Sequence, residues 1–234
     1  MKAAITWAAG LALAASLTVP QPAWAGKPQV GAEESTRTLY LGLIRQARID
    51  GKARAALAYL DDFDRQHPGD REAQVLRVNC LLDLGQVEAA QAALARVAND
   101  HGDADVLAVR GHVLSAQGRW TEAVSAYLLA QAASPADPFV GNALGYAQLR
   151  SGDASRAVET LKRALDLAPD AAHGNAVVRN NLALALTAAG RSDEAGALLA
   201  QVRDPAERAR LRAGLAAETV RDAALESGPP PRMQ

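Results

Sequence analysis

Residues 118–135 read GRWTEAVSAYLLAQAASP, and residues 152–169 repeat the pattern as GDASRAVETLKRALDLAP. Both segments begin with Gly-x-x-x-x-Ala and end with a proline 17 residues after the glycine. The Gly-x-x-x-x-Ala motif occurs five times along the chain, at intervals of 34, 33, 34 and 38 residues, and a proline follows at the same distance in three of the copies. The five copies begin at Gly51, Gly85, Gly118, Gly152 and Gly190. A regular period of this length is typical of arrays of helix-turn-helix units.

Apolar residues with helical spacing lie on both sides of each glycine. Leu144 and Ala147 precede Gly152, for example, and Val158 and Leu161 follow it. Such spacing predicts two amphipathic helices in each unit. Glycine permits the left-handed backbone that ends the first helix, and the small alanine lets the two helices cross closely. Because neither helix can bury its apolar stripe alone, neighbouring units must stack. The sequence therefore predicts an all-α fold, an α-solenoid.

Two of the units resemble the tetratricopeptide repeat (TPR) at its small, aromatic and proline positions. The matching residues of the first unit are Gly111, Gly118, Ala123, Tyr127, Ala130 and Pro135. Those of the second are Leu144, Gly145, Gly152, Ala157, Leu161, Ala164 and Pro169. The resemblance implies a superhelical array over 37–205, with about five repeats at 37–70, 71–103, 104–137, 138–171 and 176–205.

Two features depart from the TPR pattern. Arg77 and Arg110 stand where the family usually has a leucine, so we expect a rotated helix packing in their units. Four extra residues within 170–175 are expected to lengthen the turn before the last repeat.

The first 25 residues have the layout of a secretory signal peptide. Lys2 precedes an apolar run over 5–19, and Ala-Trp-Ala at 23–25 is a small-x-small cleavage site before Gly26. The apolar run is shorter than the roughly 20 residues of a membrane-spanning helix. No cysteine adjoins the cleavage site, so lipidation is not expected. We expect a mature chain that has no transmembrane segment and is exported to a bacterial periplasm.

The remaining segments lie on either side of the array. Residues 26–36 are expected to be a linker, and 227–234, with three prolines, a disordered tail. Residues 206–226 combine a helical apolar pattern, including Leu211 and Leu215, with several arginines. A C-terminal capping helix needs this pattern, because the last repeat would otherwise expose its apolar stripe.

Charge argues against a nucleic-acid partner. Removal of the signal peptide takes away Lys2 alone and leaves 24 basic and 26 acidic residues, a net charge near −2. A nucleic-acid-binding domain would be expected to carry a basic face.

Candidate residues for catalysis or metal binding are few and scattered. The histidines are His67, His101, His112 and His173, and their spacing suits no metal site. The acidic cluster of Asp61, Asp62 and Asp64 lacks the glycine and the closing glutamate of a calcium loop, so we interpret it as a solvated helix face.

The single cysteine, Cys80, lies on the inward side of a predicted first helix and is expected to be a small buried apolar residue. Phosphate-binding loops, nucleophile elbows and zinc-hydrolase motifs are absent from the sequence. We therefore predict no catalytic residue, no metal and no cofactor, and a protein that is not an enzyme.

In the TPR family the first helix of each unit lines a groove that binds a peptide. The resemblance implies a groove that contains Arg45, Asn79, His112, Phe139, Asn142, Tyr146 and Asn180. Asparagine amides can pair with a peptide backbone, and Phe139 and Tyr146 could clamp an apolar side chain. The alternative is that these polar residues only solvate the inner face of a solenoid. The basic residues that let some TPR domains capture a C-terminal carboxylate are not reproduced.

One stretch is more specific than the repeat itself. VVRNNLALAL at 177–186, followed by Ala189-Gly190-Arg191, resembles the last repeat of TadD-like proteins of the tight-adherence (Flp) pilus system. The resemblance implies a periplasmic scaffold that binds a peptide or protein subunit during assembly of a pilus or related secretion machinery. Many members of that group carry a lipidated N-terminal cysteine, which this chain lacks. The alternative is a general periplasmic protein-binding module for envelope or polysaccharide-export machinery.

Overall fold

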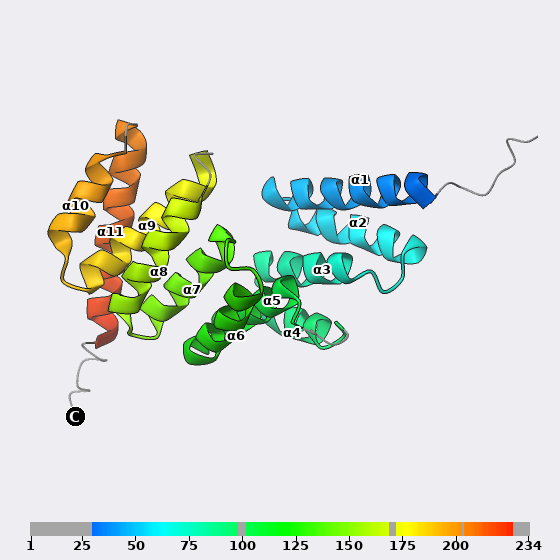
Figure 1. Ribbon diagram of the computed structural model, residues 1–234, viewed down its shortest axis with the longest axis horizontal. Helices are drawn as coiled ribbons and strands as arrows, with labels where there is room; N and C mark the ends of the chain where they lie inside the picture. Colours follow the sequence, from blue (N-terminus) through cyan, green and yellow to red (C-terminus); the bar gives the residue numbers. More distant parts are fainter. Residues whose placement is uncertain (1–29, 98–101, 169–171, 203, 227–234) are drawn as a thin grey trace, which may run out of the picture. The chain divides into compact units, whose positions relative to one another are not determined.

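The computed structural model describes residues 30–97, 102–168, 172–202 and 204–226. Within these residues the chain forms eleven α-helices and no strand, as the sequence predicts (Figure 1). They are α1 (Val30–Ile49), α2 (Ala53–Gln66), α3 (Arg71–Asp83), α4 (Val87–Leu94), α5 (Ala104–Ala116), α6 (Trp120–Ala133), α7 (Pro138–Arg150), α8 (Ala154–Leu167), α9 (Ala172–Ala188), α10 (Ser192–Ala200) and α11 (Pro205–Glu226).

The backbone divides into two compact units, Met1–Leu39 and Tyr40–Gln234. The described part of the first unit is the beginning of α1. The packing described below belongs to the second unit, which holds the rest of α1 and the ten helices that follow. None of the described helices is both long enough and apolar enough to cross a membrane.

The five motif glycines end the first helix of each pair, as predicted. Their φ angles are all positive, between 70° and 92°, a region that glycine enters without steric cost. After Gly118, the Arg119 amide donates to the Leu114 carbonyl at 2.9 Å, the long bond of a Schellman cap. The residue after each of the other four glycines makes the same bond five residues back. The recurrent glycine thus sets the turn inside every helix pair.

The alanines of the motif lie where helices cross. Ala56, Ala90, Ala123 and Ala157 are fully buried and Ala195 is nearly so. In α5 and α7 a glycine of the first helix also stands where that helix approaches the second. A Cβ atom on Gly111 would lie 2.4 Å from the Tyr127 ring, and one on Gly145 would lie 2.4 Å from Leu161 Cγ. Small residues on both sides therefore set the close approach of α5 to α6 and of α7 to α8.

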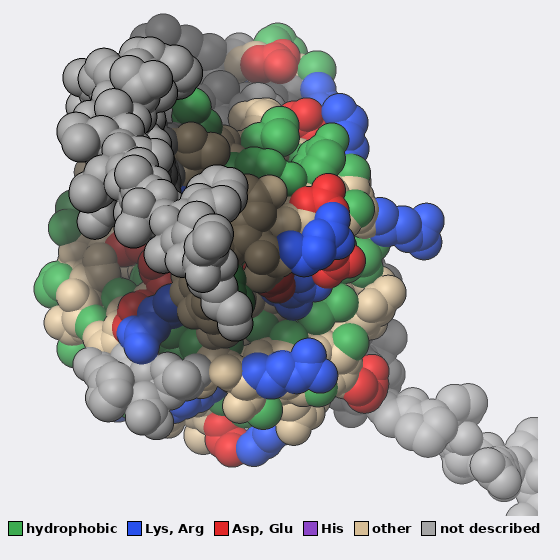
Figure 2. Space-filling view, turned by 90° about the vertical axis from the view of Figure 1, so that its right-hand side faces the viewer, with side chains coloured by type: hydrophobic (Ala, Val, Ile, Leu, Met, Phe, Trp, Pro, Cys, Tyr) green, Lys and Arg blue, Asp and Glu red, His purple; other side chains and the backbone are tan. Residues whose placement is uncertain are grey.

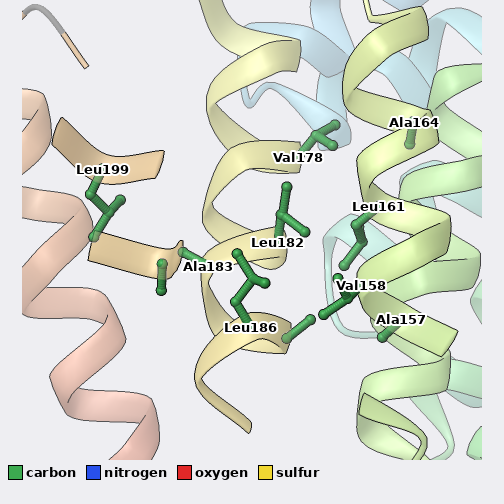
Figure 3. Packing of buried hydrophobic residues seen from close by; sticks show 11 residues of the cluster. Ala157, Val158, Leu161, Ala164, Val178, Leu182, Ala183, Leu186 and Leu199 are labelled. Atoms are coloured by element: carbon green, nitrogen blue, oxygen red, sulfur yellow. The ribbon is translucent and has the colours of Figure 1, made fainter. Parts of the chain in front are cut away.

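The core is a chain of local clusters. The largest joins α8, α9 and α10 through side chains such as Val158, Leu161, Leu182, Leu186 and Leu199 (Figure 3). Leu211 and Leu215 of α11 pack against this cluster. The fold therefore includes the predicted C-terminal capping helix, and its inward leucines cover the apolar side of the last helix pair.

Two boundaries differ from the expectation. α1 begins at Val30, so the helix extends into the predicted linker. Residues 32–37 include alanine, glutamate and arginine, which favour helix, and no proline follows Pro28 until Pro68.

The four extra residues before the last repeat lengthen a helix rather than a turn. α9 has 17 residues, whereas α3, α5 and α7 have 13 each. Four residues are close to one helical turn of 3.6, so α9 gains a turn without changing the face that it packs inward.

Candidate peptide-binding face

The first helices of successive pairs are joined by polar side chains. Arg45 of α1 forms an ion pair with Glu72 of α3. Nδ1 of His112 on α5 lies 3.2 Å from Oδ1 of Asn79 on α3.

A similar bond joins α9 to α7, where Asn181 Nδ2 donates to Asn142 Oδ1 at 2.9 Å. The groove positions predicted from the sequence therefore include residues that meet across neighbouring helices. We use the name first-helix face for a set of residues on the first helices of the repeats, whether or not they meet across helices. Its members are Arg45, Glu72, Asn79, Asp105, His112, Phe139, Asn142, Tyr146, Val177 and Asn180.

Charges near the N-terminal part of this face are largely paired. Arg48 Nε lies 2.6 Å from Asp83 Oδ2, and Arg71 Nη1 lies 3.1 Å from Asp103 Oδ2. Basic and acidic side chains are likewise interspersed with hydrophobic ones on the side of the molecule shown in Figure 2. Such a mixed surface favours selective contacts over attraction to a polyanion.

His112 is a neutral hydrogen-bonding group at physiological pH. Burial lowers its pKa from 6.5 to about 4; the positive charge of Arg48 lowers it further, and the negative charge of Asp83 opposes the shift. The imidazole also lies against the Tyr127 ring, with 5.6 Å between ring centroids. The Tyr127 hydroxyl is 3.3 Å from Ser115 Oγ. Burial raises the pKa of Tyr127 to about 12, although the bond to Ser115 lowers it. Both side chains are therefore held inside the repeat.

Phe139 and Tyr146 differ in their surroundings. The Tyr146 hydroxyl accepts a bond of 3.1 Å from Arg150 Nη1, and its ring meets the edge of Trp120 at 6.0 Å between centroids. The Arg150 guanidinium lies 4.9 Å from the Trp120 ring centroid, within cation–π range. By contrast, 68% of Phe139 is exposed. Tyr146 is thus already engaged by its own chain, and Phe139 is the more available aromatic.

The bond across α7 and α9 involves a different asparagine from the one singled out in the sequence. Asn180 is half-buried, whereas the neighbouring Asn181 makes the bond to Asn142. Trp120 and Arg150 were also missed. Trp120 follows the Gly118 turn at the start of a second helix, a place where the repeat pattern assigns no groove residue.

The acidic cluster is only partly a solvated face. Asp62 pairs with Arg65 on the same helix, as a surface residue would. Asp61 and Asp64, however, each contact Arg77 of α3 at 2.8 Å. The arginine that replaces the usual leucine therefore reaches back to α2, and these two carboxylates help to hold the helix pair to its neighbour.

The other reactive side chains are placed as follows. Cys80 is buried, as predicted, and burial is the main cause that raises the pKa of its thiol. His67 stacks against Phe63, with 4.5 Å between ring centroids. His101 and the side chain of His173 lie outside the described residues. No group of three or more metal-binding side chains occurs in the part of the chain that the structure describes.

Comparison with known proteins agrees with this architecture. The sequence model of the tetratricopeptide repeat family matches residues 47–113 and 148–218. No curated protein sequence matches the chain. Among solved structures, TTC0263, a thermophilic TPR protein of Thermus thermophilus, is similar with a TM-score of 0.65 and 23% identity. That match covers 79% of this chain and 99% of TTC0263.

A second similar structure is MamA, from residue 41 to its end, of Desulfovibrio magneticus RS-1. It has a TM-score of 0.54 and 21% identity, and the match covers 71% of this chain and 92% of that one. At such identities the two structures support the fold alone. TPR arrays generally serve as non-enzymatic scaffolds for protein–protein interaction. On the family match and the repeated helix pairs, the chain belongs to the tetratricopeptide repeat family.

Proposed function

We propose that the protein is a periplasmic scaffold that binds a peptide or protein subunit during assembly of a tight-adherence (Flp) pilus or a related secretion machinery. The single observation that carries the binding role is the first-helix face, where side chains of successive repeats form one series. Asn79, Asn142 and Asn180 are half-buried members of this face, and their amide groups can exchange hydrogen bonds with a peptide.

The pathway rests on sequence features. Residues 1–25 have the layout of a signal peptide, which supports export. The stretch at 177–191, which resembles the last repeat of TadD-like proteins, supports a role in pilus assembly. It forms most of α9 and the turn before α10. That stretch therefore combines packing residues such as Leu182 and Leu186 with Val177 and Asn180 of the first-helix face.

Site-specific photo-cross-linking in the producing bacterium tests the scaffold role. A photoreactive phenylalanine analogue at Phe139 should capture a pilus or secretion component. The same analogue at Leu129, an exposed leucine of the second helix α6, is the matched control and should capture much less of it. Mass spectrometry identifies the captured protein, and sequencing of the N-terminus of the periplasmic chain should begin at Gly26.

A deletion strain tests the pathway independently of the contact surface. Loss of the gene should abolish or strongly reduce surface pili, and a plasmid copy should restore them. Normal surface pili in the deletion strain would contradict the pilus role and leave the binding role intact.

The alternative is a general periplasmic adaptor for envelope or polysaccharide-export machinery. It is favoured by the absence of a cysteine near the predicted cleavage site, where many TadD-like proteins are lipidated. Neighbouring genes separate the two: pilin, prepilin peptidase and secretion ATPase genes favour the pilus role.

A further inference from the structure

The first-helix face carries an exposed apolar patch on α7 and α9. Phe139 is 68% exposed and Val177 is 54% exposed. Phe139 lies three residues before Asn142, and Val177 lies four residues before Asn181. Since residues three or four apart share a helix face, both lie one turn before the bond that joins these helices. We call these two residues the Phe139–Val177 patch.

The same position changes character along the array. The second residue of α3 is Glu72 and that of α5 is Asp105, whereas the second residue of α7 is Phe139. Val177 is the equivalent residue of α9, which begins one turn earlier. Glu72 is already paired with Arg45. The face thus passes from acidic to apolar between α5 and α7.

Negative charge borders the apolar patch. Asp137 caps α7, where its Oδ1 accepts from the amides of Phe139 at 2.8 Å and Val140 at 3.3 Å. Desolvation raises the pKa of Asp105, and the charges of Asp103 and Asp137 raise it further, while Arg45 opposes them. Within the described residues, no ion pair or side-chain hydrogen bond engages the Asp105 carboxylate. A cation placed here would relieve the mutual repulsion of these carboxylates.

We propose that the Phe139–Val177 patch, together with Asp105, binds a partner segment in which a lysine or arginine neighbours an apolar side chain. This inference rests on the proposed scaffold function and names the chemistry of the segment that the scaffold takes. The apolar side chain covers Phe139 and Val177, and the cation lies between Asp105 and the Phe139 ring, whose face also attracts positive charge. An acidic segment is repelled by the same carboxylates.

Fluorescence anisotropy with the full mature chain tests the charge and the apolar parts separately. The probe is a labelled ten-residue peptide in which lysines alternate with leucine and phenylalanine. One matched peptide has glutamate for each lysine, and another has serine for each apolar residue. The lysine–apolar peptide should bind more tightly than either, and added salt should weaken its binding.

Two variants have controls of the same chemistry on second helices. Phe139→Ser and Asp105→Asn should each weaken binding of the lysine–apolar peptide by about fivefold or more. Leu129→Ser on α6 and Asp166→Asn on α8 also change exposed side chains and should leave the affinity unchanged. Unfolding curves verify that all four variants keep the fold.

The inference is overturned if the glutamate peptide binds as tightly, if no peptide binds, or if each variant loses no more affinity than its control. A dimer in sedimentation velocity that Phe139→Ser abolishes would assign the patch to a second copy of the chain and would also overturn it. The scaffold function fails by a different result. If cross-linkers along the first-helix face capture no partner in the cell, the scaffold function is contradicted. If the Phe139 and Asp105 variants capture the partner as well as the unchanged protein does, only this inference is contradicted.

Discussion

His112 links the stability of the array to pH through a single proton. The folded protein holds the imidazole against Tyr127 and Asn79, and its pKa is about 4 there instead of 6.5. As the pH falls below about 6.5, the His112 imidazole is protonated in the unfolded chain, whereas in the folded chain it stays neutral until about pH 4. The unfolded state therefore binds more protons over this interval, and the protein loses stability as the pH falls.

We expect the free energy of unfolding to decrease by up to about 1.4 kcal/mol per pH unit within this interval on account of His112. The variant His112→Gln cannot titrate and should lack this part of the pH dependence. Urea unfolding at about pH 7 and about pH 5 measures it for both proteins. An equal loss of stability in the two proteins would show that His112 is not the cause.

Ala123 shows how a single methyl group sets the distance between two helices. It is fully buried at the crossing of α5 and α6. Ala123→Leu should destabilise the protein by about 1–3 kcal/mol, because three additional carbons must enter a filled space. Ala132→Leu, at an exposed position of the same helix, is the control and should change stability little. Similar melting temperatures for the two variants would contradict this account of the motif.

α11 closes the array as an element whose inner and outer sides differ. Leu211 and Leu215 pack against the α8–α10 cluster, whereas Arg210 and Arg212 are exposed. The double variant Leu211→Ala/Leu215→Ala should lower the free energy of unfolding by about 1–3 kcal/mol through lost apolar burial. Arg210→Ala/Arg212→Ala shortens two long side chains of the same helix and should have a small effect. A larger effect of the arginine pair would mean that α11 is held by charge instead of packing.

The elements could be predicted from sequence because their boundaries depend on local chemistry. Each repeat needs a glycine with positive φ at one position and a small residue at another, where two helices cross. Both residues recur at the spacing of the repeat, so the sequence alone reveals them. The beginnings of α1 and α9 were placed less well. Residues that precede a repeat can extend its first helix when they include no helix-breaking residue. These residues lie outside the repeat motif, so the motif does not predict their structure.

The first-helix face was less predictable, because its side chains contact residues of other helices and the spacing of the repeat does not specify those contacts. Whether Asn180 or Asn181 meets Asn142 depends on how α9 is rotated about its own axis where it packs against α7. Tyr146 is held by Trp120 from the preceding helix pair and by Arg150 from its own helix, a combination that no spacing rule contains. The repeat therefore predicts which helix faces a partner, and the contacts between helices decide which side chains remain available.

Across the second unit, stability is organised along the chain. Each of the five apolar clusters is drawn from consecutive helices, so the core has no single centre. In such arrays a helix is stabilised mainly by its immediate neighbours. Interior helices have neighbours on both sides, whereas a terminal helix has them on one side only.

We therefore expect graded protection against hydrogen exchange. Amides in α5–α8 should exchange most slowly in the native protein, and those in α11 should exchange faster by local opening. Mass spectrometry of exchanged peptides measures this profile at residue ranges that match the helices. Uniform protection from α2 to α11 would instead indicate one cooperative unit.

Alkylation of Cys80 can measure local opening of the helices without any introduced label. It is the only cysteine in the chain, and it is buried among residues of α1, α2 and α3 such as Ile44, Phe63 and Leu76. A thiol reagent can reach its Sγ atom only when these helices separate, and in the closed state burial also raises the pKa of the thiol and so disfavours the reactive thiolate. The alkylation rate of the unmodified protein therefore measures how often the helices of the first repeats open. A partner bound along these repeats would lower that rate.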